Sequence, residues 1–234
     1  MGAFAEDPLA GMLEGNERHV HSLRRDAFHG LEDEQHPDVV TVCCADSRVP
    51  QERMWGIEDP GTLFTPSTIG NQAWDIRGDE HVVDGGIAYA VYHTDVETVA
   101  IVGHTGCGAI AAAYEAVQSG ELPGPHGVDL WIEQLIPVVD SALKADIIAG
   151  VSDDRAIINR LVEWNVDAQV KFLLDDNELP SSTDIFGFVY DFQGAYGDVP
   201  GRCYLVNYDG VTDSDRIADN LPQKYSHLAK RLTS

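Results

Sequence analysis

Short apolar runs alternate with longer amphipathic segments along the chain, and this pattern predicts the secondary structure. Residues 39–44 and 98–102 are β-branched and apolar at nearly every position, which is typical of strands buried on both faces of a sheet. Further strands are expected over 62–66, 185–192 and 202–207. Helices are expected over 8–28, 79–93, 109–117 and 156–174, between the Gly/Pro loop 120–127 and residue 156, and from about 214 onward.

The order of these elements predicts an α/β fold. We expect a mostly parallel central sheet of four strands with an added antiparallel edge strand, helices on both faces and an N-terminal helical arm. The expected buried positions of the first helix are Leu13, Val20, Leu23 and Phe28. No repeat, low-complexity tract or linker rich in Pro and Ser divides the sequence, so residues 1–234 are expected to form a single domain.

The negative charge of the chain argues against nucleic acid and membrane partners and indicates a high-salt environment. Fifteen Lys and Arg stand against 39 Asp and Glu, a net charge of -24 at pH 7, so we expect no nucleic acid and no membrane partner. Only four of the cations are lysines, and the acids are spread along the whole chain. This predicts a halophilic cytoplasm, because molar salt reduces the screening length to about 3 Å. An ordinary acidic protein from a low-salt organism is the alternative.

The N-terminal segment and the cysteines agree with a reduced, cytoplasmic location. Residues 1–12 lack the basic and apolar regions of a signal peptide, and no apolar run approaches the roughly 18 residues of a membrane span. Two of the four cysteines, Cys43 and Cys44, are adjacent and unsuited to bonding each other. Reduced thiols or metal ligands are therefore expected.

Two apolar strands end close to residues that bind metals. Cys44 is the last residue of the first strand, His104 comes two residues after the second, and Cys107 lies on the turn before a helix. Ligands in open α/β sheets sit outside the carboxyl ends of the strands, so these side chains are expected to converge. Two thiolates and an imidazole select Zn2+, and three protein ligands leave a fourth position open for catalysis. Taken alone, however, the His-x-x-Cys spacing also occurs by chance, and Cys44 could be an ordinary buried thiol.

Asp46 and Arg48 follow the first candidate ligand at two-residue steps. Alternate side chains of an extended segment point to the same side, so Asp46 is placed to reach the open metal position while Arg48 keeps it ionised. A surface salt bridge at a strand end would also explain the pair. The Gly108 amide, at a helix N-terminus, is placed to bind an anion, although tight turn geometry alone would account for the glycines there.

These two motifs, C-A-D-S-R at 44–48 and G-H-T-G-C-G at 103–108, resemble those of the β-class carbonic anhydrases. The resemblance covers most of the chain, through Gly15-Asn16, Gly70-Asn71, Tyr89-Ala90 and Val189-Tyr190-Asp191. It implies one Zn2+ per subunit on Cys44, His104 and Cys107 and a catalytic dyad of Asp46 and Arg48. It also implies the reversible hydration of CO2 to bicarbonate and a proton through a zinc-bound hydroxide.

Other positions resemble the plant-like, constitutively open branch of this family. Gln35-His36-Pro37 matches the glutamine-x-proline motif of that branch. Ser67-Thr68 and Thr41 stand where the bicarbonate-regulated branch has an arginine and a tryptophan, so that regulation is not expected. The resemblance further implies a pocket completed across a dimer interface, and hence a homodimer or higher oligomer. The implied substrate-binding residues are Gln35, Phe64, Ile69, Tyr89 and the amide of Gly108.

Two other functions could use the same residues. A member of this family that hydrolyses CS2 or COS would have the same zinc and dyad behind a restricted entrance, and the sequence does not distinguish the two. A non-catalytic zinc-binding module would have Asp46 permanently on the metal. Arg48 argues against the second alternative, because its pairing would draw Asp46 off the metal.

Overall fold

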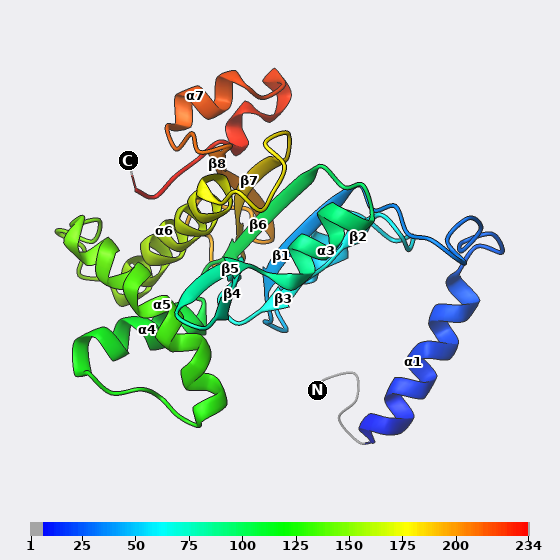
Figure 1. The fold of residues 1–234 in the computed structure, drawn as a ribbon, viewed down its shortest axis with the longest axis horizontal. Helices are drawn as coiled ribbons and strands as arrows, with labels where there is room; N and C mark the ends of the chain where they lie inside the picture. Colours follow the sequence, from blue (N-terminus) through cyan, green and yellow to red (C-terminus); the bar gives the residue numbers. More distant parts are fainter. Residues whose placement is uncertain (1–6, 234) are drawn as a thin grey trace.

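The computed structural model describes residues 7–233, and its centre is a six-stranded sheet (Figure 1). The strand order is β2-β1-β6-β7-β8, with β3 also paired to β1, and every pair is parallel except β7 with β8. The predicted α/β fold with an antiparallel edge strand is confirmed, and the short β2 and β3 take the place of the strand predicted over 62–66. The strands are β1 (Val39–Cys44), β2 (Leu63–Phe64), β3 (Ser67–Thr68), β6 (Thr98–His104), β7 (Asp184–Asp191) and β8 (Arg202–Tyr208).

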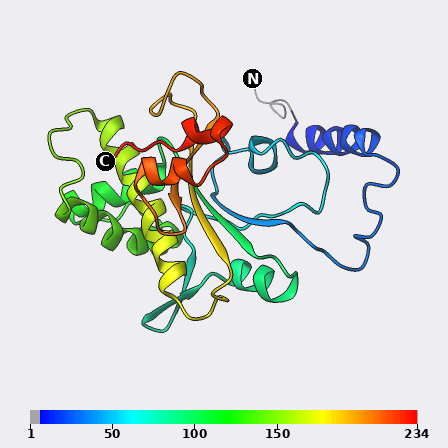
Figure 2. The ribbon, with the colours of Figure 1, turned by 90° about the horizontal axis from the view of Figure 1, so that it is seen from above.

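The helices cover the two faces of the sheet unequally. Alternate residues of β1 belong to two separate apolar clusters, because successive side chains of a strand point to opposite faces. Val40 and Val42 pack with α3, α4, α5 and α6 in the larger cluster, whereas Cys43 lies in a smaller cluster beside α2. Figure 2 shows α4, α5 and α6 gathered on one side of the sheet. The helices are α1 (Pro8–Ser22), α2 (Gln51–Met54), α3 (Gly85–His93), α4 (Gly108–Ser119), α5 (His126–Lys144), α6 (Asp154–Asp175), α7 (Ser214–Asp219) and the 3-10 helix η1 (Gln223–Leu228).

The segment 79–93, predicted as one helix, contains a strand and a shorter helix. Strands β4 (Trp74–Arg77) and β5 (Glu80–Val83) form an antiparallel hairpin around Gly78, whose φ of +65° suits glycine. Helix α3 begins only at Gly85, because Asp84 caps it by accepting hydrogen bonds from the N–H groups of Gly86 and Ile87. The helix prediction was therefore wrong for residues 79–84.

Helix α1 lies apart from the rest of the described chain (Figures 1 and 2) and has no buried residue. The N-terminal arm is thus present, but its predicted burial was wrong. Leu13, Val20 and Phe28 are 62%, 55% and 52% exposed, and Leu23 is only partly buried. Within residues 7–233 no other element buries a side chain of this helix, and the helix ends at Ser22, six residues before the predicted end.

No helix in residues 7–233 combines the length and the apolar character needed to cross a lipid bilayer. The first six residues of segment 1–12, on which the prediction about a signal peptide depends, lie outside the described residues.

Candidate metal centre

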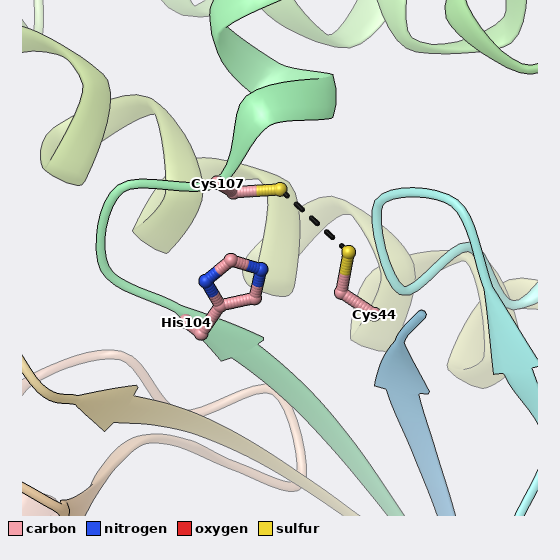
Figure 3. A group of neighbouring side chains, drawn as sticks. All are labelled: Cys44, His104 and Cys107. Atoms are coloured by element: carbon pink, nitrogen blue, oxygen red, sulfur yellow. Dashed lines mark hydrogen bonds between the residues drawn. The ribbon is translucent and has the colours of Figure 1, made fainter. Parts of the chain in front are cut away.

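Three buried side chains with metal-binding atoms meet at the carboxyl end of the sheet (Figure 3). Cys44 ends β1, His104 ends β6, and Cys107 immediately precedes α4. Because β1 and β6 are neighbouring parallel strands, their last residues lie at the same edge. The ligand atoms of the three residues all lie within 4.8 Å of one another. The structure therefore brings together the three residues that the sequence singled out as ligands.

The turn that carries Cys107 back over the strand ends depends on Gly106. This residue has a φ of +66°, and a Cβ atom there would collide with the side chain of Gln193. Its N–H donates to Asn159 Oδ1 at 2.8 Å, and its carbonyl oxygen accepts from Arg48 Nη2 at 3.2 Å. The N–H and the carbonyl group of Gly106 are thus both hydrogen-bonded, which fixes the conformation of the turn.

The imidazole of His104 is oriented with one nitrogen free. Its Nδ1 lies 3.0 Å from the carbonyl oxygen of Thr105, so Nδ1 carries the hydrogen and donates it. Nε2 then presents a lone pair, is buried, and has no hydrogen-bond partner among the described residues. A buried polar atom without a partner is costly, and coordination of a metal would satisfy it.

The two thiols are spaced for a shared metal ion. Their Sγ atoms are 3.9 Å apart, close to the roughly 3.8 Å expected for two sulfurs on tetrahedral zinc with Zn–S bonds of about 2.3 Å. The hydrogen bond from Cys107, together with contacts from His104 and the Gly70 N–H, lowers the pKa of Cys44 to about 5, although burial acts in the opposite direction. The same hydrogen bond and burial raise the pKa of Cys107. One thiolate is therefore available at neutral pH, and a metal ion would replace the remaining proton.

Asp46 and Arg48 form a two-point ion pair beside the ligands. Arg48 donates from Nε to Oδ1 at 2.8 Å and from Nη2 to Oδ2 at 2.6 Å. These side-chain hydrogen bonds, with one from the Arg48 backbone, lower the pKa of Asp46 to about 2. Asp46 Oδ2 also lies 3.5 Å from Nε2 of His104. The carboxylate therefore stays ionised and faces the ligand atoms while Arg48 holds it.

Comparison with known protein families matches residues 39–196 to the family described as carbonic anhydrase. This segment is more than half of the chain and contains the three candidate ligands and the Asp–Arg pair. The chain belongs to the carbonic anhydrase family.

Individual carbonic anhydrases agree with this assignment. The chain is 36% identical to carbonic anhydrase 2 of Mycobacterium tuberculosis over 138 residues, which are 55% of this chain and 61% of that protein. It is 29% identical to a carbonic anhydrase of Emericella nidulans over 161 residues, 69% of this chain and 65% of that one. Each match thus spans less than two thirds of the relative. A tetrameric β-carbonic anhydrase from Sordaria macrospora has the same fold, with a TM-score of 0.67 at 22% identity over 85% of this chain and 94% of that one.

Two of the predicted substrate-binding residues lie beside the candidate ligands. Gly108 is the first residue of α4 and directly follows Cys107. Ile69 is partly buried and precedes Gly70, whose N–H donates to the Cys44 sulfur at 3.4 Å. These positions suit contact with a small molecule at the centre.

The other three predicted substrate residues lie elsewhere in the same chain. Phe64 pairs in register with Val40, four residues before Cys44, which is about 13 Å along the strand. Its ring stacks on Tyr89 with the centroids 6.0 Å apart. Tyr89 and Gln35 line one cavity of about 610 Å³ together with acidic residues and histidines of segments 31–36 and 93–95. Gln35, Phe64 and Tyr89 are thus close together but do not line the candidate metal centre of their own chain.

The sequence did not reveal several residues that shape the centre. Phe192 stacks on His104 and lies under the guanidinium of Arg48. Asn159, on α6, holds the Gly106 turn, and the Thr105 carbonyl orients His104. Of these residues only Thr105 lies within a recognised motif. It orients His104 through its backbone carbonyl oxygen, which any residue at this position would supply.

Proposed function

We propose that this chain is a zinc-dependent carbonic anhydrase that catalyses the reversible hydration of CO2 to bicarbonate and a proton. The observation that carries the proposal is the convergence of Cys44, His104 and Cys107 beside an Asp46 carboxylate held by Arg48. Two thiolates and one imidazole suit one zinc ion per subunit, and three protein ligands are typical of catalytic zinc sites. When bound, zinc would supply the Lewis acidity that lowers the pKa of water, an effect established for carbonic anhydrase itself.

The residues around the ligands have separate tasks in this proposal. Asp46, ionised because of Arg48, accepts a hydrogen bond from the attacking water and so orients it. Arg48 prevents the carboxylate from taking the position that the substrate needs. Gly108 and Ile69 offer a backbone amide and an apolar surface to CO2, which carries no charge and needs little polar recognition.

A homodimer or higher oligomer completes the site in this proposal. Helix α1 exposes Leu9, Met12, Leu13 and Val20, which a second copy could cover. Gln35, Phe64 and Tyr89 are grouped away from their own metal centre, as expected if they serve the centre of a neighbouring subunit. The similar protein of Sordaria macrospora is described as tetrameric.

The remaining assignments depend on sequence features. We assign the chain to the plant-like, open branch because the Arg48 pair draws Asp46 toward itself and because Gln35-His36-Pro37 is present. We also propose a single domain and a halophilic cytoplasm. The net charge of -24 and the scarcity of lysine support that location.

Stopped-flow measurements with CO2, COS and CS2 on zinc-loaded protein in molar KCl test the function. Rapid CO2 hydration with little hydrolysis of the sulfur compounds is expected. Hydrolysis of COS or CS2 without CO2 hydration would favour the related hydrolase. A zinc-loaded protein inactive on all three would indicate a non-catalytic zinc-binding module.

A further inference from the structure

Phe192 contacts both the candidate metal ligand and the candidate catalytic dyad. Its ring stacks on the imidazole of His104, with centroids 5.7 Å apart and an interplanar angle of 23°. The guanidinium carbon of Arg48 lies 4.6 Å from the centroid of the same ring. Phe192 directly follows β7, almost 90 positions after His104 in the sequence. One aromatic ring thus joins two parts of the centre.

A buried turn fixes the position of this ring. The carboxylate of Asp191 is buried and accepts hydrogen bonds from the N–H groups of Gln193, Ala195 and Tyr196. The N–H of Phe192 itself donates to Thr105 Oγ1 at 3.2 Å. Thr105 follows His104, so the ring and the imidazole are tied to one backbone segment. Phe192 is therefore held in place independently of Arg48.

The Asp46 carboxylate can turn either toward Arg48 or toward the metal-ligand atoms. Its Oδ2 accepts from Arg48 Nη2 at 2.6 Å, and the same atom lies 3.5 Å from the free Nε2 of His104. The Arg48 side chain is 48% exposed, so water competes for the guanidinium, and exposed ion pairs of this kind are weak unless their geometry is held. The Phe192 ring covers one face of the guanidinium and attracts its charge.

We propose that Phe192 is a positioning residue that holds Arg48 against Asp46 and thereby keeps the fourth metal position open. This role rests on the proposed zinc centre. Without the aromatic face, Arg48 is less restrained, and Asp46 turns toward the metal as an additional ligand. Phe192, directly after β7, thereby determines the fraction of molecules in which the fourth metal position is free for an anion or substrate.

Azide binding to the cobalt-loaded protein, followed by its visible spectrum, tests this role. Phe192→Leu keeps apolar bulk without an aromatic face, whereas Phe192→Trp restores one. We expect Phe192→Leu to bind azide about fivefold more weakly and cobalt at least as tightly as wild type. Phe192→Trp should bind azide as wild type does. The double variant Phe192→Leu/Asp46→Ala should regain azide binding, because no carboxylate remains to close the position.

Two outcomes would overturn the role of Phe192 alone. The first is unchanged azide affinity in Phe192→Leu, and the second is an equal loss in the Leu and Trp variants, which would indicate a packing effect. A wild-type protein that binds no cobalt would instead overturn the zinc centre, and this role with it.

The metal-free protein provides a second measurement that does not depend on cobalt. The Arg48 Nε hydrogen, which donates to Asp46 Oδ1 at 2.8 Å, should exchange with solvent about fivefold faster in Phe192→Leu than in wild type. Nuclear magnetic resonance of the arginine side chains measures this rate. Equal exchange rates in the two proteins would contradict the contact on which the proposal depends.

Discussion

At the residue scale, strand alternation gives two adjacent thiols opposite properties. Cys44 faces the candidate metal centre, whereas Cys43 is buried on the other face with Val49, Ala100 and Val102. Burial raises the pKa of Cys43 far above its ordinary value and that of Cys203 to about 12. Hydrogen bonds from Cys107, His104 and the Gly70 N–H instead lower the pKa of Cys44 to about 5. The surroundings of each thiol, and not its residue type, make Cys44 suitable as a metal ligand.

Replacement of single cysteines tests the ligand assignment. Cys107→Ala should lower zinc affinity by a factor of at least about 100, since loss of an outer-shell partner already costs up to that much. Cys203→Ala, which removes a thiol of β8 outside the centre, should retain one zinc per chain. Metal analysis after dialysis against a weak chelator measures both. Stoichiometric zinc in Cys107→Ala would refute the assignment.

At the scale of elements, buried polar side chains of α6 position the loops around the centre. Asn159 holds the Gly106 turn, as described above. Asn165 Nδ2 donates to the Gly70 carbonyl at 3.0 Å, and Gln169 Oε1 accepts from the Ala73 N–H at 2.8 Å. The loop at 70–73 in turn supplies the N–H that contacts the Cys44 sulfur. Helix α6 therefore supports both loops at the ligands without itself providing a ligand.

The same helix anchors the C-terminal segment through a buried ion-pair network. Arg231, with a side chain 6% exposed, lies 3.3 Å from Glu163 and 2.6 Å from Asp167. Glu163 is fully buried and also accepts hydrogen bonds from the N–H groups of Leu232 and Thr233. Removal of the arginine would leave two carboxylates without their cation.

Arg231→Met should therefore lower the free energy of unfolding by about 3 to 5 kcal/mol, the usual effect of breaking a buried pair. Lys144→Met is the matched control, because its pair with Asp140 is exposed and should contribute less than about 1 kcal/mol. Urea unfolding at equal protein concentration compares them. Equal losses in the two variants would contradict the account.

The cap of α3 predicts a dependence of stability on pH. Burial raises the pKa of Asp84 above its ordinary value, so the folded protein binds this proton more tightly than the unfolded chain does. The stability gained from this tighter proton binding is complete at pH values below the pKa of Asp84 in the unfolded chain. It is lost as the pH rises through the higher pKa that Asp84 has in the folded protein. Asp84→Asn keeps an acceptor for the helix N–H groups and should be more stable than wild type at pH 7.

Urea unfolding at pH 7 and pH 3 measures this effect. The advantage of Asp84→Asn should narrow toward pH 3, where the wild-type carboxyl is neutral. Asp84→Ala, which removes the cap, should be less stable than Asp84→Asn at both values by about 1 kcal/mol. An advantage of Asp84→Asn that stays constant with pH would argue against burial as its cause.

At the scale of the whole molecule, nearly all of the acidic charge lies on the surface. Among the acidic residues that the structure describes, only Glu163 and Asp191 are buried, and both serve structural hydrogen bonds. The net charge of -24 therefore acts mainly through repulsion across the surface, which salt screens. Its effect should fall on folding and on association, and only indirectly on the metal centre.

Lowering KCl from about 1 M to 0.1 M lengthens the screening distance from about 3 Å to about 10 Å. We expect the protein to become less resistant to urea, or its oligomer to dissociate, before zinc is lost. Light scattering, urea unfolding and metal analysis at each salt concentration measure the order of events. Unchanged assembly and stability in 0.1 M KCl would contradict a salt-adapted surface.

The hydrophobic pattern of the sequence predicted the main strands of the central sheet well. Contacts between residues far apart in the sequence could not be predicted from it. Strand β1 was located to the residue because its apolar run is bounded by Pro37 and by polar residues from Asp46 onward. The β4–β5 hairpin was missed because the apolar pattern of residues 79–93 is helix-like. The turn at Gly78 and the cap at Asp84 instead make residues 80–83 a strand and start the helix at Gly85. Phe192 and the polar residues of α6 were missed because their partners lie far away in sequence, where periodicity carries no information.

We expect CO2 hydration by this chain to depend on one zinc ion held by Cys44, His104 and Cys107. The exchange of oxygen-18 between CO2 and water, measured in molar KCl while zinc is titrated into metal-free protein, tests it most directly. The exchange rate should rise in proportion to added zinc, stop rising at one ion per chain, and stay at the uncatalysed rate in His104→Ala. A fully zinc-loaded protein that does not accelerate the exchange, or acceleration that does not depend on zinc, would contradict it.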